Sequence, residues 1–196
     1  MSTRQLVLAS QSPRRRELLA LLGIPFTVVP SRATEMPAEG ESPTEFVKRA
    51  ARDKGIEVAA RVPASIILSA DTIVVVDDEI LGKPVDEYDS VRMLERLSGR
   101  QHSVYTAVAV VDSDTDSRLE GIEETRVWFR DLDRNTIEDY IRREDVMDKA
   151  GAYAIQGYAS IFIPKIEGNY PNVVGLPFPL TSDLLASNGL PCPTSS

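Results

Sequence analysis

The pattern of apolar and polar positions predicts a chain in which short strands and helices follow one another along most of its length. The run at 66–76 is rich in β-branched residues and, apart from Ser69, apolar on both sides of the pair Asp71-Thr72. An unbroken run of this kind is typical of a central strand covered on both faces. A hairpin closes after it, and a Ser/Asp-rich turn joins a later antiparallel pair. Strands are predicted at 6–9, 26–29, 66–76, 79–81, 103–112, 118–129 and 161–163.

Helix start and stop signals divide the remaining segments. Ser12-Pro13 provides an N-cap and a proline at the first helical position, and Gly23 ends that helix. Ser42-Pro43-Thr44-Glu45 is a capping box that opens a second helix, after a Pro/Glu/Gly-rich loop at 30–42. Further helices are predicted at 89–97, 136–143 and 181–186. Because helices and strands alternate irregularly, we expect an α/β fold with a mixed central sheet.

The length suits one well-cored domain, which we expect at 1–190, with a disordered tail at 191–196. A net charge of −8 argues against nucleic-acid and anionic-membrane partners, which require a basic field. The excess carboxylates are available to a divalent metal. A single cysteine, Cys192, excludes an intrachain disulfide, and the sequence shows no long apolar run and no signal peptide. We therefore expect a cytoplasmic protein.

The start of the first helix indicates an anion site. Three arginines, Arg14 to Arg16, occupy its first turn, although the positive end of the helix dipole favours acidic residues there. The penalty is relieved if the turn holds a phosphate, and a strand–turn–helix N-terminus suits one. The alternative is that these arginines pair with carboxylates on the surface. Three in succession after Ser-Gln-Ser-Pro favour the phosphate site.

Further candidates stand at isolated positions along the chain. Asp71, inside an apolar strand, must be hydrogen-bonded, metal-bound or raised in pKa, because burial disfavours its charged form; a structural carboxylate held by backbone N–H groups is the alternative. Lys54 and Lys83 are further candidates, although each would equally suit an ordinary exposed position on the surface. Gln156 lies in a glycine-bounded apolar loop and could read the amide-like edge of a base. With His102 as the only histidine, the chemistry must depend on carboxylates, Lys and Arg, which favours metal-assisted phosphate chemistry.

Six motifs in order resemble the Maf family of nucleoside triphosphate pyrophosphatases. They are Ala9-Ser10-Gln11-Ser12-Pro13-Arg14-Arg15, Ser69-Ala70-Asp71-Thr72, Gly82-Lys83-Pro84, Ser98-Gly99-Arg100 with His102 and Thr106-Ala107-Val108, Lys149 to Gly157, and Asn172 to Pro177. The resemblance implies a homodimeric, two-lobed α/β fold with a cleft, related to the inosine triphosphate pyrophosphatases. It also implies hydrolysis of a nucleoside triphosphate to monophosphate and pyrophosphate with Mg²⁺ or Mn²⁺.

The resemblance also assigns roles to individual positions. The proton acceptor corresponds to Asp71. The positions that set specificity correspond to Arg14, Thr72 and Gln156. Phosphate contacts correspond to Ser10, Arg14, Arg15, Lys54 and Lys83, and metal contacts to Glu35 and Asp71. The loop Ala152-Tyr153-Ala154-Ile155-Gln156-Gly157 resembles the branch that acts on dTTP and UTP, whereas the 7-methyl-GTP branch has a Ser-Glu in this loop.

Two other functions remain open at this stage. The first is a nucleotide-binding regulator of cell division and septum formation with little hydrolysis; a cellular effect that does not depend on Asp71 would favour it. The second is a phosphomonoesterase built on Asp71-Thr72. Enzymes that form an aspartyl phosphate require a second acid two residues later, where this chain has Ile73.

Overall fold

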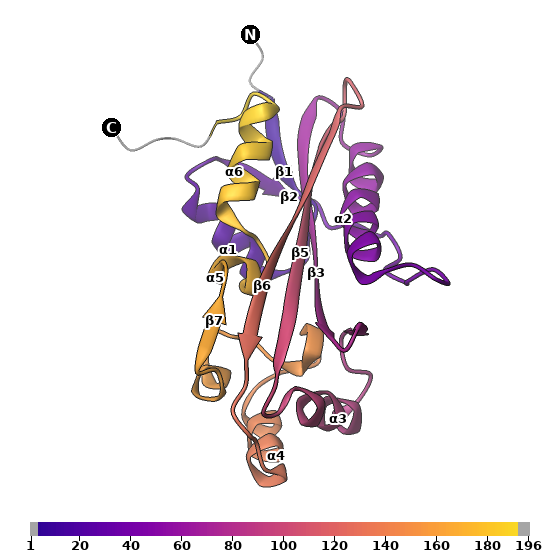
Figure 1. The fold of residues 1–196 in the computed structure, drawn as a ribbon. Coiled ribbons are helices and arrows are strands. Elements are labelled where there is room, and N and C mark those ends of the chain that lie inside the picture. The colour runs from indigo at the N-terminus through magenta and orange to yellow at the C-terminus, as the bar shows by residue number, and fades with distance from the viewer. Residues whose placement is uncertain (1–3, 192–196) are drawn as a thin grey trace. The chain divides into compact units, whose positions relative to one another are not determined.

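The computed structural model describes residues 4–191, which form a mixed α/β fold around one seven-stranded sheet (Figure 1). The strand order is β2-β1-β3-β5-β6-β7, and β4 pairs with β3. The strands are β1 (Gln5–Leu8), β2 (Phe26–Val28), β3 (Ser65–Val76), β4 (Glu79–Leu81), β5 (Gln101–Asp112), β6 (Arg118–Trp128) and β7 (Lys165–Glu167). The predicted α/β class is confirmed.

Strand directions within the sheet confirm that it is mixed. β1 runs parallel to β2 and β3, whereas β4 is antiparallel to β3 and β7 is antiparallel to β6. Asp112 N donates to Ser117 O at 2.9 Å and Phe129 N donates to Arg100 O at 2.9 Å, so β5 and β6 run in opposite directions. The antiparallel pair predicted from the Ser/Asp-rich turn is therefore present.

The chain divides into two compact units, which are described separately. The first contains residues up to Asp71, Thr106–Glu123 and the residues from Gly175 onward. The second contains Thr72–Tyr105 and Glu124–Val174. Strands β3, β5 and β6 contribute residues to both units, and the boundary on β3 falls between Asp71 and Thr72.

Helix boundaries follow the capping signals in the sequence. Ser12 Oγ accepts from Arg15 N at the start of α1, and the capping box of α2 is complete, with Ser42 and Glu45 each accepting from the other's backbone N–H. The helices are α1 (Pro13–Leu21), α2 (Pro43–Ala59), α3 (Glu87–Leu97), α4 (Arg134–Arg143), α5 (Tyr170–Val174) and α6 (Phe178–Ser187). Between residues 4 and 191, no helix is long and apolar enough to cross a membrane.

In the first unit, the alternation of side chains along β3 determines what meets α2. Because successive side chains point to opposite faces, Ile67, Ser69 and Asp71 share the face that α2 covers. Ile67 packs in a buried cluster with Val58 of α2, and α1 and α6 lie on the other side of the sheet (Figure 1). The apolar β3 run thus forms the centre of this unit's core.

In the second unit, a group of aromatic rings packs together within the core. Phe129 makes edge-to-face contacts with Tyr153 and Phe162, at centroid distances of 4.9 and 6.3 Å. Tyr140 of α4 contacts Phe162 at 5.2 Å. Helix α3 packs against α4 and against the short 3₁₀ segment η1 (Ala150–Ala152). These contacts fix the loop that carries Gln156 onto its own unit.

The strand predicted at 161–163 is wrong. The segment is part of the 3₁₀ helix η2 (Tyr158–Phe162), in which Ser160 Oγ donates to Gly157 O at 2.8 Å. Phe162 is buried, but Ile161 is 48% exposed, so the run has no continuous apolar surface to cover. Three apolar residues are too few to distinguish a strand from a helical turn.

Two short elements have no counterpart among the predicted elements. Edge strand β7 begins with Lys165, whose ammonium lies 4.2 Å from the centre of the Trp128 ring. Helix α5 has only five residues and begins at Tyr170, in the motif that leads to α6. The expected tail lies outside the described residues except for Pro191, as does Cys192.

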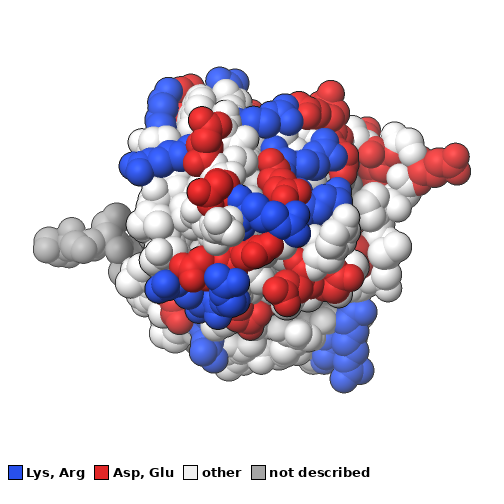
Figure 2. Space-filling view, turned by 90° about the horizontal axis from the view of Figure 1, so that it is seen from below, with Lys and Arg blue, Asp and Glu red and all other residues white. Residues whose placement is uncertain are grey.

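Acidic and basic side chains are interspersed on the face shown in Figure 2 and form no large area of a single sign there. Many surface pairs are local, such as Arg134–Glu138 at 2.8 Å and Arg143–Asp139 at 2.7 Å. Exposed pairs of this kind contribute little to stability.

Candidate functional site

The first turn of α1 is built as a polar strand-to-helix connection. Ser10 is buried, and its hydroxyl accepts from Ser12 N at 3.2 Å; Ser12 in turn accepts from Arg15 N. Arg14 and Arg15 are half-buried, whereas Arg16 is exposed. Two of the three arginines are therefore partly buried at a helix N-terminus, where an anion is favoured.

Arg15 is held from the far end of the chain. Its Nε donates to the carbonyl oxygen of Gly175 at 2.9 Å, across 160 positions of sequence. Burial lowers the pKa of the Arg15 guanidinium from its ordinary value, and the carboxylates of Asp71 and Glu35 act against that shift. Arg15 thus shares its electrostatic environment with both acidic candidates.

Lys54 joins those two carboxylates. Its Nζ lies 2.7 Å from Asp71 Oδ1 and 2.9 Å from Glu35 Oε1. Lys54 and Asp71 are buried, and the Glu35 side chain is 41% exposed. A buried carboxylate without a partner is strongly unfavourable, so the ammonium compensates Asp71 directly. Of the outcomes predicted for Asp71, the hydrogen-bonded one is present, with Lys54 as the donor.

A close approach of α2 to β3 places Lys54 beside Asp71. Ser69 Oγ donates to Ala51 O at 2.7 Å, so the helix backbone contacts the strand two residues before Asp71. A Cβ at Gly55 would lie 2.8 Å from Ser69 Oγ and 3.0 Å from Val111. Because only glycine fits there, the neighbouring Lys54 reaches the same face of β3 as Ser69 and Asp71.

The remaining predicted residues, Thr72, Lys83 and Gln156, belong to the second unit. Thr72 is half-buried on β3, and the Lys83 and Gln156 side chains are exposed. Gly151 N donates to Gly82 O at 3.0 Å, which links the hairpin end carrying Lys83 to the loop carrying Gln156. The structure brings these two regions together within the unit.

The Gln156 loop is anchored by buried tyrosine and histidine side chains. Tyr153 Oη and His102 Nε2 are 2.8 Å apart, and Ala154 N donates to Tyr140 Oη at 3.3 Å. Tyr158 N donates to Glu144 at 3.2 Å, just beyond Gly157, which adopts a φ of +83°. Contacts on both sides of Gln156 therefore hold the loop while its amide faces solvent.

His102 is a buried structural residue. Desolvation lowers its pKa from 6.5 to about 3, so the ring is neutral near pH 7. It makes edge-to-face contacts with Phe129 and Tyr153 at 5.1 and 5.4 Å. Its environment is thus aromatic and neutral.

A metal at Glu35 and Asp71 requires ligands beyond the protein. Within residues 4–191, no group of three or more His, Cys, Asp or Glu is arranged to hold a metal ion. Two carboxylates nevertheless suit Mg²⁺ or Mn²⁺, and Mg²⁺ is commonly held by one or two carboxylates together with substrate phosphates. The donor set therefore fits a metal that arrives with a triphosphate.

The contact between Arg15 and Gly175 has no local signal in the sequence. The motif Asn172 to Pro177 is visible, but nothing in it shows that a carbonyl there accepts from an arginine near the N-terminus. Gly175 adopts a φ of +121°, a conformation open to glycine, which accounts for this residue type at the position.

Comparison with known proteins identifies the family. The sequence model described as "Maf-like protein" matches residues 5–188. The chain is 50% identical over 187 residues to a dTTP/UTP pyrophosphatase of Symbiobacterium thermophilum, covering 95% of both chains. It is 50% identical over 177 residues to a protein of the same name from Geobacter sulfurreducens, covering 90% of this chain and 93% of the relative. The chain therefore belongs to the Maf family.

Proposed function

We propose that this chain is a nucleoside triphosphate pyrophosphatase that hydrolyses dTTP and UTP to the monophosphate and pyrophosphate. The observation that carries the proposal is the buried ammonium of Lys54, which is bonded to both Asp71 and Glu35 in the unit that also holds Arg15. The names of the relatives at 50% identity supply the substrate class.

Asp71 acts as the general base in this proposal. It accepts a proton from a water molecule whose oxygen attacks the α-phosphorus. As the new P–O bond forms, the bond between the α-phosphorus and the bridging oxygen breaks, and that oxygen leaves with pyrophosphate. Lys54 holds Asp71 Oδ1 at 2.7 Å, which fixes the carboxylate during the transfer.

The basic residues bind the triphosphate and stabilise the charge that develops on the leaving group. Arg14, Arg15, Ser10 and the α1 N-terminus form the phosphate-binding part, and Lys54 and Lys83 neutralise charge on the pyrophosphate. Glu35 and Asp71 would hold a divalent cation, Mg²⁺ or Mn²⁺, which would supply further positive charge to the phosphate oxygens.

Thr72 and Gln156 read the pyrimidine. A glutamine amide offers one acceptor and two donors, so it can match both a carbonyl and an N–H on one base edge. Gln156 suits this role because its loop is anchored while its amide is exposed.

As part of the same proposal, residues 1–190 work as one functional Maf-like domain in a cytoplasmic homodimer, as the family resemblance implies. Light scattering on the purified protein measures the oligomeric state directly, and a monomer at assay concentration would contradict the dimer.

Product analysis tests the function. Purified protein is incubated with Mg²⁺ or Mn²⁺ and each of dTTP, UTP, CTP, ATP, GTP and 7-methyl-GTP. We expect pyrophosphate and monophosphate from dTTP and UTP, and no turnover when the metal is chelated. Orthophosphate release would instead favour a phosphomonoesterase, and binding without any product would favour a nucleotide-binding regulator.

A further inference from the structure

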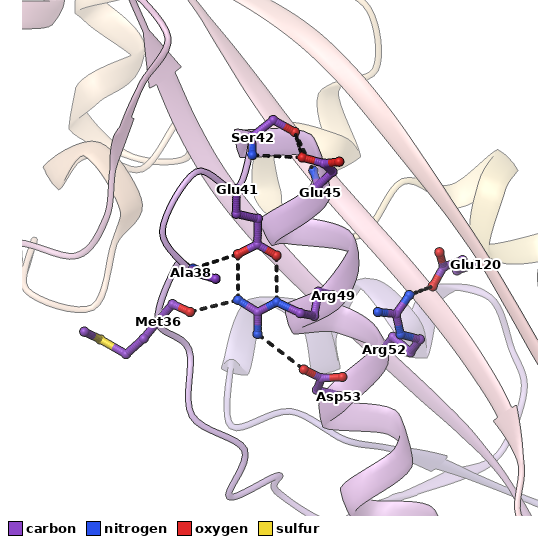
Figure 3. A network of polar contacts seen from close by, with 9 residues as sticks. All are labelled: Met36, Ala38, Glu41, Ser42, Glu45, Arg49, Arg52, Asp53 and Glu120. Atoms are coloured by element: carbon purple, nitrogen blue, oxygen red, sulfur yellow. Dashed lines mark hydrogen bonds and ion pairs between the residues drawn. The ribbon is translucent and has the colours of Figure 1, made fainter.

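A single arginine on α2 connects that helix to the loop at 30–42 (Figure 3). Arg49 Nε and Nη2 donate to the two carboxylate oxygens of Glu41 at 2.6 and 2.7 Å. Nη2 also donates to the carbonyl oxygen of Met36 at 2.8 Å, and Nη1 lies 3.4 Å from Asp53 on the same helix. The guanidinium therefore makes a two-pronged ion pair and a backbone contact with one loop.

The loop segment from Met36 to Glu41 closes on itself around the same carboxylate. Ala38 N donates to Glu41 Oε2 at 2.9 Å, and Glu41 N donates to Ala38 O at 3.1 Å. Hydrogen bonds lower the pKa of Glu41 to about 2, with the larger contribution from Arg49 and a smaller one from Ala38 N–H. The carboxylate is therefore ionised at neutral pH. The side chain of Glu41 is only 11% exposed. Arg49 thus holds a preformed turn instead of an extended stretch of chain.

The residue whose carbonyl Arg49 holds directly follows Glu35. The Met36 side chain is 68% exposed, so packing of that side chain contributes little to fixing the segment. Glu35 in turn reaches Lys54, which lies five positions after Arg49 on α2. Helix α2 therefore contacts the loop at two places, through Arg49 at Met36 and through Lys54 at Glu35.

We propose that Arg49 is a positioning residue for Glu35, holding the loop so that the Glu35 carboxylate meets Lys54. The role requires an arginine. Its planar fork binds both oxygens of Glu41 and still donates to Met36, whereas a lysine ammonium has neither that reach nor that geometry. The kinetic consequence rests on the proposed function, but the effect on the loop does not.

Hydrogen exchange measures the loop directly. In Arg49→Lys, we expect the amides of Ala38 and Glu41 to exchange about tenfold faster than in the wild type, because the turn opens more often. The matched control is Arg52→Lys on the same helix, whose partner is Glu120 on β6 at 3.4 Å. Unchanged exchange in Arg49→Lys, or equal acceleration in both variants, would overturn the proposal.

Kinetics then test whether the effect passes through Glu35. With dTTP, we expect Arg49→Lys to lower kcat by about tenfold with little change in KM, and Arg52→Lys to leave both unchanged. In a Glu35→Gln background, Arg49→Lys should cause no further loss, since coupled residues are not additive. Full additivity of the two losses would contradict the positioning role.

The two experiments separate failure of this proposal from failure of the proposed function. A wild type that releases no pyrophosphate contradicts the function, and the exchange experiment then decides the role of Arg49 alone. An active wild type with unchanged exchange and kinetics in Arg49→Lys contradicts the positioning role and leaves the function intact.

Discussion

The two units bury polar groups of different kinds. Among the described residues, every buried charged side chain belongs to the first unit: Lys54, Asp71 and Asp112. The buried polar side chains of the second unit are uncharged, namely Ser90, His102, Thr125 and Asn172, with His102 neutral because burial lowers its pKa to about 3. The residues of that unit proposed to bind substrate, such as Lys83 and Gln156, are exposed instead.

In the proposed function, this contrast corresponds to two roles, catalysis in the first unit and recognition of the nucleobase in the second. A base and its counter-charges are most effective where water is excluded, because electrostatic interactions are stronger there. A residue that reads a base requires only a fixed backbone and an accessible amide. The first unit therefore contains buried ion pairs, whose disruption would destabilise the fold, whereas the second unit contains neutral hydrogen bonds and aromatic contacts.

Removing the proposed base, Asp71, should have the largest effect on activity. We expect Asp71→Asn to lower pyrophosphate release from dTTP by about a thousandfold, within the range for loss of a general base. Nucleotide binding, measured by calorimetry, should change by less than about tenfold. The matched control is Asp112→Asn, another buried carboxylate of the first unit, which pairs with Arg4. Near-normal turnover in Asp71→Asn would refute the assignment.

Removing a buried charge should affect stability far more than removing an exposed one. Lys54→Met leaves Asp71 buried without its ammonium partner, so we expect the free energy of unfolding to fall by about 3 kcal/mol. Lys83→Met, at an exposed position of the second unit, should stay within about 0.5 kcal/mol of the wild type. Denaturant unfolding measures both, and equal losses would remove the distinction between the units.

Lowering the pH should reduce the free energy of unfolding through His102, a residue of the second unit. Its pKa in the folded protein, about 3, lies below the ordinary 6.5, so the unfolded chain binds the extra proton first. The stability due to neutral His102 is present above pH 6.5 and is lost as the pH falls toward 3. From pH 7 to pH 5, we expect a loss of about 2 kcal/mol attributable to this residue.

The variant His102→Gln lacks this titration and isolates the effect. The pH dependence of its unfolding free energy should be flatter than that of the wild type over this range. If the free energies of unfolding of the two proteins changed in parallel with pH, His102 would not be a neutral buried ring in the folded protein.

Gln156 should change selectivity without changing stability. We expect Gln156→Ala to lower kcat/KM for dTTP and UTP by about tenfold, because a base edge loses its hydrogen-bond partners. Its unfolding midpoint should match the wild type, since the side chain is exposed. An equal loss for every nucleotide tested would assign Gln156 to general binding instead of base reading.

Local signals in the sequence predicted much of this structure. The apolar β3 run, the Ser42–Glu45 capping box and the Ser12-Pro13 helix start all appear where those signals place them. A hydrogen bond to Asp71 is one of the outcomes that a carboxylate inside such a strand predicts, and Lys54 donates it. Each of these features depends on residues close together in the chain.

What the sequence did not predict depends on distant or weakly patterned partners. The bond from Arg15 to Gly175 joins positions 160 residues apart, and the loop contact of Arg49 arises only once α2 and the loop have folded. The 161–163 run was mistaken for a strand because three apolar residues carry no clear period. Family resemblance, not spacing, supplied the roles of Glu35 and Thr72.

The position of water attack tests the central claim most directly. Hydrolysis of dTTP is run in H₂¹⁸O, and both products are analysed by mass spectrometry. The proposed chemistry predicts one ¹⁸O atom in dTMP and none in pyrophosphate, because water attacks the α-phosphorus. Label in pyrophosphate, or orthophosphate as the labelled product, would contradict it.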